Sequence, residues 1–364
     1  MRIHDLDTPA LLVDLDIMER NLKRAAEYAR EHNLRLRPHT KTHKTPALGR
    51  LQLDFGAAGL TVAKVSEAEV MVEAEPADLL IAYPIVSGRK VARLMRVARH
   101  TRVTVAVDSV EAANGISEAA AAEGVVIHIL AEMDVGMGRA GVAPGPGLVE
   151  LARAITGMPA LELDGVAFYP GHIKSLDEAG FRALDALASV VARVSEDFRR
   201  EGLPLHIVSG GSTPALYYSH RVTGMNEIRP GTYIFNDRNC VACGACRLED
   251  CAATILATVV STARPNGMLI DGGSKTFFSD RLVTGGDNYF GHILEAPEAR
   301  FFKMNEEHGY VDLADSSRRF RIGDRLRVIP NHICVAVALH EKIYGIRGED
   351  VVEVWKVAGR GKLQ

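Results

Sequence analysis

The sequence predicts an α/β fold: a (β/α)8 barrel of the TIM type, followed by a second, mostly β domain. The first reason is a regular alternation of short β-rich runs with stretches of helical length from about residue 8 to residue 236. The second is that seven of the connecting stretches are long enough for parallel crossovers. The third is a change after residue 250, where strand-like runs follow one another with little helix between them.

Eight barrel strands are expected in chain order, after a lead-in run at 8–15. They lie at 34–41, 60–64, 78–84, 102–108, 125–134, 161–171, 205–212 and 227–236. Helices are expected in stretches that include 17–31, 66–74, 109–123 and 177–200. In such a barrel the catalytic groups lie in the loops that follow the strands, so the residues of those loops carry the functional prediction.

The second domain is predicted from its strands alone. The strand-like runs are 253–263, 267–271, 310–313, 325–329, 333–339 and 351–357. We therefore expect a barrel over residues 10–236 and a β domain over residues 237–364, which residues 1–9 could join.

Composition and charge exclude several classes of partner. The formal charge of −3, from 43 basic and 46 acidic residues, leaves no basic surplus to hold a nucleic acid. No apolar run approaches the roughly 18 to 20 residues that span a bilayer, and the first residues lack the layout of a signal peptide. We expect a cytoplasmic protein with neither a membrane nor a nucleic acid as partner.

Two glycine-containing loops after the last two barrel strands predict a phosphate site. One contains Gly210, Gly211, Ser212 and Thr213, and the other contains Gly231 and Thr232. Glycines let the backbone approach an anion, while hydroxyls and the turn of a following helix donate hydrogen bonds to it. A phosphate site at this place is a recurring barrel feature, although the first loop alone could equally be a tight turn.

Lys41 is the candidate for a lysine that forms a Schiff base. By the alternation of a strand, Arg35, Arg37, His39 and Lys41 share one face of the run 34–41, so Lys41 ends a polar inward row. Crowding by Arg37 and flanking histidines would push its ammonium toward the neutral, nucleophilic form. Lys44 is the weaker candidate, and a solvated basic loop is the alternative interpretation.

His332 and Cys334 are candidate metal ligands. They lie two residues apart in the strand-like stretch 331–339, so both side chains are expected on one face, where an imidazole nitrogen and a thiolate can bind one ion. Two protein ligands would leave positions open for water and substrate, which is a catalytic arrangement. A chance pair on a sheet is the alternative.

Four of the five cysteines crowd into one short segment. Cys240, Cys243, Cys246 and Cys251 have the spacing C-x2-C-x2-C-x4-C. A bacterial ferredoxin run has three residues before its last cysteine and a proline after it, so both departures weaken the match to an iron–sulfur site. Small buried or loop thiols are the favoured interpretation, and an iron–sulfur cluster or zinc is the alternative.

A barrel-end lysine, a phosphate site and a β domain together suggest pyridoxal phosphate. The sequence resembles the D-threonine aldolase / D-serine dehydratase family of alanine-racemase-like pyridoxal phosphate enzymes through nearly its whole length. The resemblance rests on six segments, at 7–14, 37–44, 133–141, 209–214, 229–233 and 330–334.

The resemblance implies roles for individual residues. Lys41 would hold the cofactor as an imine, Arg139 would approach its phenolic oxygen, and Arg229 would face the pyridine nitrogen. His172 would lie beside the ring, and Tyr169 would border cofactor or substrate unless it is a barrel tyrosine bonded to backbone. His332 and Cys334 match the family's metal site, which implies one divalent ion, Mn²⁺, Mg²⁺ or Zn²⁺.

The function implied is that of a metal-assisted, pyridoxal phosphate-dependent lyase acting on small D-β-hydroxy amino acids. Retro-aldol cleavage of D-threonine-like substrates to glycine and an aldehyde is favoured, with His43 or His172 as the base for the β-hydroxyl. The alternatives are a D-serine dehydratase, in which Lys41 takes the Cα proton, and a non-catalytic pyridoxal phosphate binding protein. By analogy with this architecture we expect a homodimer.

Overall fold

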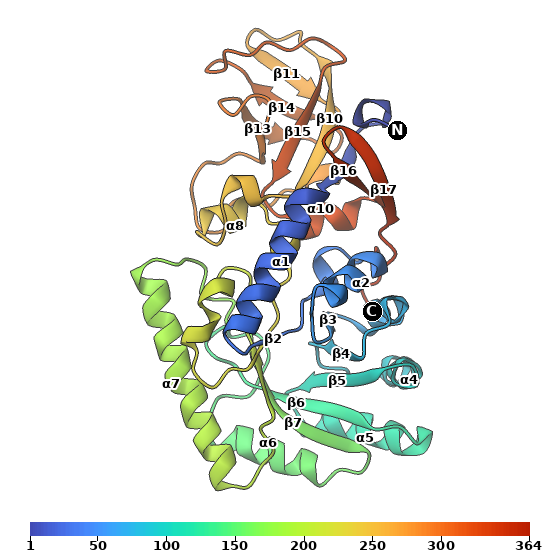
Figure 1. Ribbon diagram of the computed structural model, residues 1–364, viewed down its shortest axis with the longest axis vertical. Helices are drawn as coiled ribbons and strands as arrows, with labels where there is room; N and C mark the ends of the chain where they lie inside the picture. The colour runs from blue at the N-terminus through green and yellow to red at the C-terminus, as the bar shows by residue number, and fades with distance from the viewer. The chain divides into compact units, whose positions relative to one another are not determined.

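The computed structural model describes all residues from 1 to 364, and the chain forms two compact units (Figure 1). The β unit comprises Met1–Lys23, Thr42–Thr45 and Thr232–Arg360. The barrel unit comprises Arg24–Lys41, Pro46–Gly231 and Gly361–Gln364. Neither unit is one continuous segment, because the chain passes between them at several points.

The barrel unit contains all eight predicted parallel strands, so the predicted fold class is confirmed. The strands are β2 (Arg35–Leu36), β3 (Leu60–Val62), β4 (Asp78–Ile81), β5 (Arg102–Val107), β6 (Ile127–Glu132), β7 (Leu161–Ala167), β8 (Ile207–Gly210) and β9 (Glu227–Ile228). Their order is β2-β9-β8-β7-β6-β5-β4-β3. A parallel bridge between His39 and Thr61 then joins the two ends of this sheet, which brings β2 beside β3.

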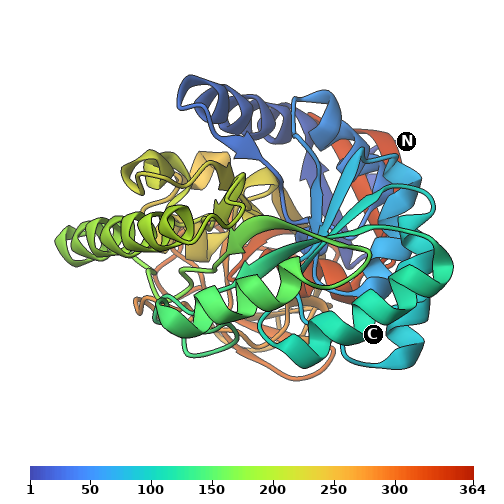
Figure 2. The same cartoon turned by 90° about the horizontal axis from the view of Figure 1, so that it is seen from below.

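Helices connect these strands and lie outside them, as the view in Figure 2 shows for the green and cyan helices. They are α2 (Pro46–Asp54), α3 (Val65–Met71), α4 (Gly88–Ala98), α5 (Val110–Glu123), α6 (Pro146–Thr156) and α7 (Glu178–Arg200), while α1 (Leu15–Glu31) runs from one unit into the other. Ser109 and Asp177 cap α5 and α7, since each side-chain oxygen accepts a backbone N–H of the first turn. The predicted helix starts near 109 and 177 follow from these caps.

One glycine in the barrel leads to a stability prediction. Gly165 lies in β7 at a β-bulge with φ of +147°, and a Cβ atom there would lie 2.0 Å from the backbone oxygen of Ile207. Gly165→Ala is expected to lower the free energy of unfolding by about 3 kcal/mol or more, because backbone must move to admit the methyl group.

The matched control for this change is Gly115→Ala. Gly115 lies inside helix α5, and no heavy atom lies within 4 Å of the position of its Cβ. Alanine there is expected to raise the free energy of unfolding by roughly 0.5–1 kcal/mol. Urea unfolding of both variants checks the pair, and equal stabilities would contradict the argument about the bulge.

The β unit is built on a nine-stranded sheet, so the predicted mostly β domain is confirmed. Its strands are β1 (Ala10–Asp14), β10 (Ala253–Ser261), β11 (Gly267–Ile270), β12 (Gly291–Ile293), β13 (Arg300–Met304), β14 (Gly309–Asp312), β15 (Arg325–Pro330), β16 (Lys342–Arg347) and β17 (Asp350–Lys356). The lead-in run 8–15 becomes β1, a central strand antiparallel to β10 and parallel to β16. Its residues Leu11, Leu12 and Val13 are fully buried.

Two predicted strands are corrected by the structure. The run 333–339 is helix α10 (Ile333–Leu339) instead of a strand, and the carboxylate of Asp237 accepts the N–H of Ile333 at its first turn, 3.0 Å away. The run 34–41 is a strand only at Arg35–Leu36, and Lys41 lies in a 3-10 turn, η2 (Thr40–Thr42). Pro38 contributes to this interruption, because it has no N–H for the ladder.

Two further short helices belong to the β unit, namely α8 (Arg238–Ala242) and α9 (Ser274–Phe277). No helix in either unit combines the length and the apolar character that crossing a lipid bilayer requires.

Candidate active site

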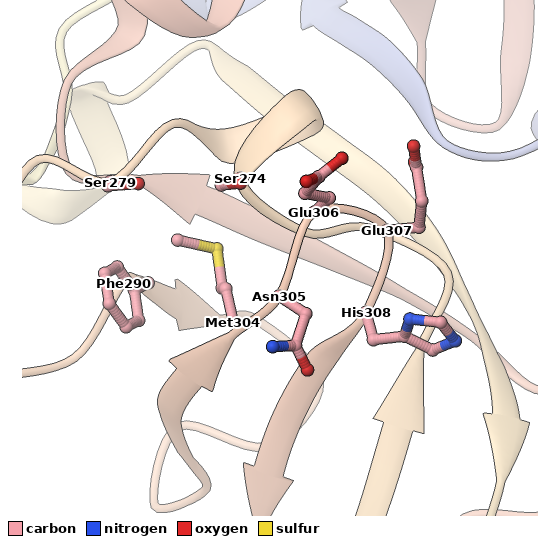
Figure 3. A pocket seen from close by; sticks show the side chains of 8 residues that line it. All are labelled: Ser274, Ser279, Phe290, Met304, Asn305, Glu306, Glu307 and His308. Atoms are coloured by element: carbon pink, nitrogen blue, oxygen red, sulfur yellow. The ribbon is translucent and has the colours of Figure 1, made fainter.

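A hollow of about 490 Å³ opens in the β unit, between α9 and the turn that joins β13 to β14. In Figure 3, Phe290 and Met304 lie next to each other on one side of it, while Glu306 and Glu307 stand on the other side. The Nζ atom of Lys275 lies 2.7 and 2.9 Å from these two carboxylates and offsets one of their two negative charges. None of the predicted site residues lines this hollow, so the candidate site lies elsewhere.

Lys41 is held by its backbone in the turn η2 of the barrel unit. Its N–H points at Nδ1 of His39, 3.4 Å away, and the hydroxyl of Thr40 donates to the carbonyl of Thr61 at 3.1 Å. The Lys41 side chain is exposed, and its Nζ lies 6.0 Å from the centre of the Tyr169 ring. The turn therefore fixes the start of this side chain and leaves its amine on the side of Tyr169.

Tyr169 lies between two of the predicted cofactor ligands, in the segment after β7. The guanidinium carbon of Arg139 lies 4.9 Å from the centre of its ring, which is a cation–π distance. A Cβ atom on Gly171 would lie 2.3 Å from the same ring, so only glycine permits this position of Tyr169. The structure thus brings Lys41, Tyr169 and Arg139 together, as expected from the sequence.

The glycine-rich loop after β6 is shaped by one carboxylate. Asp134 accepts the backbone N–H groups of Gly136, Met137 and Gly138 at 3.0, 2.8 and 3.1 Å. Partial burial acts to raise the pKa of Asp134, but these donors outweigh it and hold the pKa below its ordinary value. The exposed ring of His172 lies against this loop, 3.5 Å from where a Cβ of Gly136 would be.

Arg229 is buried, and two hydrogen bonds fix its guanidinium. It donates to the carbonyl of Phe168 at 2.9 Å and to the hydroxyl of Ser209, which in turn donates to Glu227 at 2.6 Å. Burial lowers the pKa of Arg229, and the negative charges of Glu132 and Glu227 oppose that shift. Its guanidinium is therefore a fixed cation whose orientation two partners determine.

Arg37 is paired with acids, which changes the environment expected for Lys41. Its guanidinium is fully buried, with Nη2 2.6 Å from Asp78 and Nε 3.0 Å from Glu227. The contact between Nε of Arg37 and Oε2 of Glu227 is an ion pair but not a hydrogen bond, since neither atom has a hydrogen-bond partner. The expected polar row that ends at Lys41 is wrong, because the strand ends at Leu36 and Arg37 is paired with acids.

The turn after β8 has the features of an anion site. The hydroxyl oxygen of Ser212 is buried without a hydrogen-bond partner, which is costly unless a ligand supplies one. Gly211 has φ of +80°, a conformation that favours glycine. The hydroxyl of Thr213 accepts the N–H of Gly231 at 3.2 Å, which joins the two predicted phosphate loops. These residues fit the phosphate group of pyridoxal phosphate, whereas Thr232 belongs to the β unit.

Ser212→Ala is expected to weaken binding of pyridoxal phosphate roughly ten- to a hundredfold. One hydrogen bond to a charged acceptor contributes about 1.5–3 kcal/mol, and alanine removes that donor without filling the turn. Fluorescence titration of the cofactor-free protein measures the dissociation constant. Pyridoxal, which lacks the phosphate, should bind both proteins equally, and an equal loss for both ligands would assign Ser212 to the turn alone.

In the β unit, the structure brings His332 and Cys334 together at the start of α10. The two side chains form a hydrogen bond, and the sulfur of Cys334 also lies 3.3 Å from the hydroxyl of Thr42 and 3.7 Å from that of Thr232. Burial acts to lower the pKa of His332, but the cysteine outweighs it and raises the pKa to about 9. Burial acts to raise the pKa of Cys334, but His332 lowers it below its ordinary value.

A divalent metal fits this pair as a site with two protein ligands. An imidazole nitrogen and a thiolate are metal ligands, and a metal would displace the proton that they share. No group of three or more His, Cys, Asp or Glu side chains in the structure could hold a metal ion. The remaining ligands would therefore have to come from water or substrate, as the sequence predicts.

Asp237 supports this pair and was missed in the sequence. It is buried, and its two carboxylate oxygens accept the N–H of Ile333 at 3.0 Å and that of Cys240 at 2.9 Å. It thereby caps α8 and α10 together. An aspartate directly before a short helix is the signal that could have identified the first of these caps.

His43 is fully buried, and its tautomer is set by the backbone. Its Nδ1 accepts the N–H of Thr45 at 3.1 Å, and its ring meets Phe235 edge-on with centroids 6.5 Å apart. Because Nδ1 is occupied by a donor, the neutral ring carries its proton on Nε2. His43 can therefore donate a hydrogen bond from Nε2 in its neutral form.

Comparisons with known proteins cover almost the whole chain. Residues 13–239 match the family model described as the alanine racemase N-terminal domain, and residues 252–346 match a putative serine dehydratase domain. The 3-hydroxy-D-aspartate aldolase of Paracoccus denitrificans (strain Pd 1222) is 31% identical over 98% of this chain and 93% of that protein.

Solved structures agree with this relationship. The D-threonine aldolase from Filomicrobium marinum has a TM-score of 0.92 at 31% identity, covering 99% of this chain and 98% of the other. A variant of D-threo-3-hydroxyaspartate dehydratase, solved in the metal-free form, has a TM-score of 0.91 at 30% identity, covering 98% of both chains.

Proposed function

Because this chain belongs to the alanine racemase-like family with a serine dehydratase-type second domain, we propose that it is a pyridoxal phosphate-dependent lyase acting on D-β-hydroxy amino acids. The aldolase and dehydratase relatives, similar over nearly their full lengths, support this reaction class. The observation that carries the proposal is the hydrogen-bonded His332–Cys334 pair, which lies in the second domain and offers two metal ligands.

The barrel unit supplies the groups that would bind the cofactor. Ser212, Thr213 and the N–H groups of the glycine turn would hold its phosphate, and Lys41 would attach it covalently. Arg229, clamped by Ser209 and the carbonyl of Phe168, would present a positive charge to the ring nitrogen. When bound, pyridoxal phosphate supplies an electron sink for a bond broken at the substrate's Cα.

The β unit would contribute a divalent ion bound by His332 and Cys334. The ion would supply Lewis-acid stabilisation of negative charge on substrate oxygens. The thiolate character of Cys334, which His332 and the hydroxyl of Thr42 favour, suits this ligand role. Thr42 directly follows Lys41 in the chain, so one turn carries both the lysine and a contact to the metal pair.

Proton transfer would be divided among three residues. His172 is exposed beside the loop that Asp134 shapes, and a ring nitrogen of its neutral imidazole would accept the β-hydroxyl proton. His43 suits the expected role of base less well, because its Nδ1 is occupied by the N–H of Thr45, and it would donate from Nε2 instead. If the Cα proton is removed instead, Lys41 would be the base, and water elimination would follow.

We favour the aldolase reaction over dehydration. The parallel assay that tests it supplies D-threonine and measures acetaldehyde, and supplies D-serine and measures pyruvate, each with Mn²⁺ and with Zn²⁺. Acetaldehyde formation in excess of pyruvate is expected. Pyruvate without acetaldehyde would make the protein a dehydratase, and a cofactor-loaded protein inactive with both substrates and both metals would favour the non-catalytic binding protein.

A further inference from the structure

The four clustered cysteines of the β unit take no part in the proposed reaction. All are reduced thiols, and Cys240, Cys243 and Cys251 are buried, whereas Cys246 is partly exposed. They lie on α8, on the turn after it and at the start of the segment leading into β10. Solvent thus reaches the cluster through one thiol.

The four thiols do not have equivalent partners. The Cys240 thiol is hydrogen-bonded to the carboxylate of Asp237, and the Cys243 thiol donates to the carbonyl of Cys240, 3.3 Å away. Cys251 is instead hydrogen-bonded to Cys246. The cluster therefore contains one pair of thiols that face each other and two thiols that oxygen acceptors occupy.

Hydrogen bonds hold the backbone on both sides of each cysteine of this pair. The carbonyl of Asp250 accepts the side-chain amide of Asn21 at 2.8 Å, and the N–H of Ala252 donates to Phe235 at 2.7 Å, so Cys251 is held on both sides. Cys246 lies in the turn that contains Gly244, where φ is +79°. The N–H of Ala245 donates to the carbonyl of Cys240 at 2.9 Å, and the N–H of Arg247 donates to the carboxylate of Asp250 at 3.0 Å. Closure to the short S–S bond length would therefore come from rotation of the two cysteine side chains.

We propose that Cys246 and Cys251 form a dithiol site that a hydroperoxide oxidises to a disulfide. The exposed Cys246, as the thiolate, attacks the peroxide oxygen, which gives a sulfenic acid and releases water or an alcohol. The Cys251 sulfur then attacks the Cys246 sulfur, the S–S bond forms, and hydroxide leaves with the Cys251 proton as water. Two thiols lose two electrons and two protons in total, and the peroxide is reduced.

Cys251 is chosen as the partner of Cys246 because the two side chains are hydrogen-bonded, and not because of the cysteine spacing in the sequence. A metal ion is the competing use of four cysteines, but no three ligand side chains in the structure are placed to hold one. The hydrogen bond to Cys246 and burial raise the pKa of Cys251, so Cys251 stays a thiol in the reduced pair, whereas the partly exposed Cys246 is the sulfur that a hydroperoxide reaches first. This arrangement suits Cys246 as the attacking sulfur and Cys251 as the resolving one.

Tryptic mapping tests the proposal with the full-length protein, because Arg247 lies between the two cysteines. Reduced protein is treated with a small excess of hydrogen peroxide, its remaining thiols are alkylated, and it is digested without reductant. Cleavage after Arg238 and Arg247 separates a peptide containing Cys240, Cys243 and Cys246 from the peptide containing Cys251. We expect these two peptides to be joined by a disulfide that dithiothreitol breaks.

Variants identify the partner. The linked peptides should disappear in Cys246→Ser and in Cys251→Ser but persist in Cys243→Ser, the matched control, whose thiol bonds a carbonyl. Cys246→Ser changes a partly exposed turn, so it keeps the test valid if Cys251→Ser does not fold. A disulfide from Cys240 or Cys243 to Cys251 would overturn the proposal. So would the absence of linked peptides from the folded protein when the urea-unfolded protein does form them.

Metal analysis tests the competing assignment of the four cysteines to a metal or iron–sulfur site. Anaerobically purified protein is assayed for zinc, iron and acid-labile sulfide, beside Cys246→Ser. Metal bound in proportion to protein, and lost in Cys246→Ser, would assign the cluster to a metal or iron–sulfur site and overturn the dithiol. Metal content unaffected by Cys246→Ser is the expected result.

Discussion

Replacing Lys41 by alanine is expected to abolish covalent attachment of pyridoxal phosphate and to lower activity by at least about a thousandfold. Lys41 lies in the turn η2 with its amine 6.0 Å from the centre of the Tyr169 ring. The purified variant should lack the visible absorbance of a lysine-bound cofactor. After borohydride treatment its mass should show no added cofactor, whereas the unchanged protein should carry one.

Two other lysines provide controls for this result. Lys64 has its Nζ 3.4 Å from the centre of the Tyr83 ring, and Lys44 is buried in the β unit, where its carbonyl accepts the N–H of Gly359. Lys64→Ala and Lys44→Ala should both keep the covalent cofactor. A borohydride-stable adduct that persists in Lys41→Ala and is lost in Lys44→Ala would move the attachment site three residues along the chain.

The barrel could be predicted because its signal is local and repeated. Each of the eight strands is a short β-rich run, and caps such as Ser109 and Asp177 mark the helices between them. The position of β1 could not be predicted in this way. Its neighbours β10 and β16 lie far along the chain, and only their pairing makes it a central strand of the β unit.

The residues of the candidate site could be selected from the sequence, but the strand geometry used to select them was wrong. Lys41 was chosen on a strand alternation that ends at Leu36, so the argument from a shared strand face does not hold. His332 and Cys334 do contact each other, but at the start of a helix instead of on a strand. The alternating Val335 and Val337 after Cys334 favour a strand. The carboxylate of Asp237, nearly a hundred residues earlier, caps the helix instead.

Some features of the site have no signature in the sequence. The clamp on Arg229 uses the backbone carbonyl of Phe168, and its other partner, Ser209, is oriented by Glu227 on the neighbouring strand. The unpaired hydroxyl of Ser212 likewise appears only when the strands are assembled. Such contacts depend on register between strands that are distant in sequence, and composition does not encode register.

Removing the metal pair is expected to have the second large effect. His332→Ala and Cys334→Ala should each lower activity by at least about a hundredfold while leaving the covalent cofactor in place. Chelation of the unchanged protein should do the same, and added Mn²⁺, Co²⁺ or Zn²⁺ should restore only that protein. The reason is that each substitution leaves a single protein ligand, and the structure holds no third His, Cys, Asp or Glu side chain to replace it.

Metal binding itself separates a ligand role from a structural one. With Co²⁺, the unchanged protein should show a thiolate-to-metal charge-transfer band that Cys334→Ala abolishes. His340→Ala is the matched histidine control, because the Nδ1 of His340 lies 2.8 Å from the carbonyl of Ala336 and the residue ends the same helix. It should keep both the band and the activity. Full activity and an undiminished cobalt band in Cys334→Ala would remove that cysteine from the metal site, and full activity in His332→Ala would do so for the histidine.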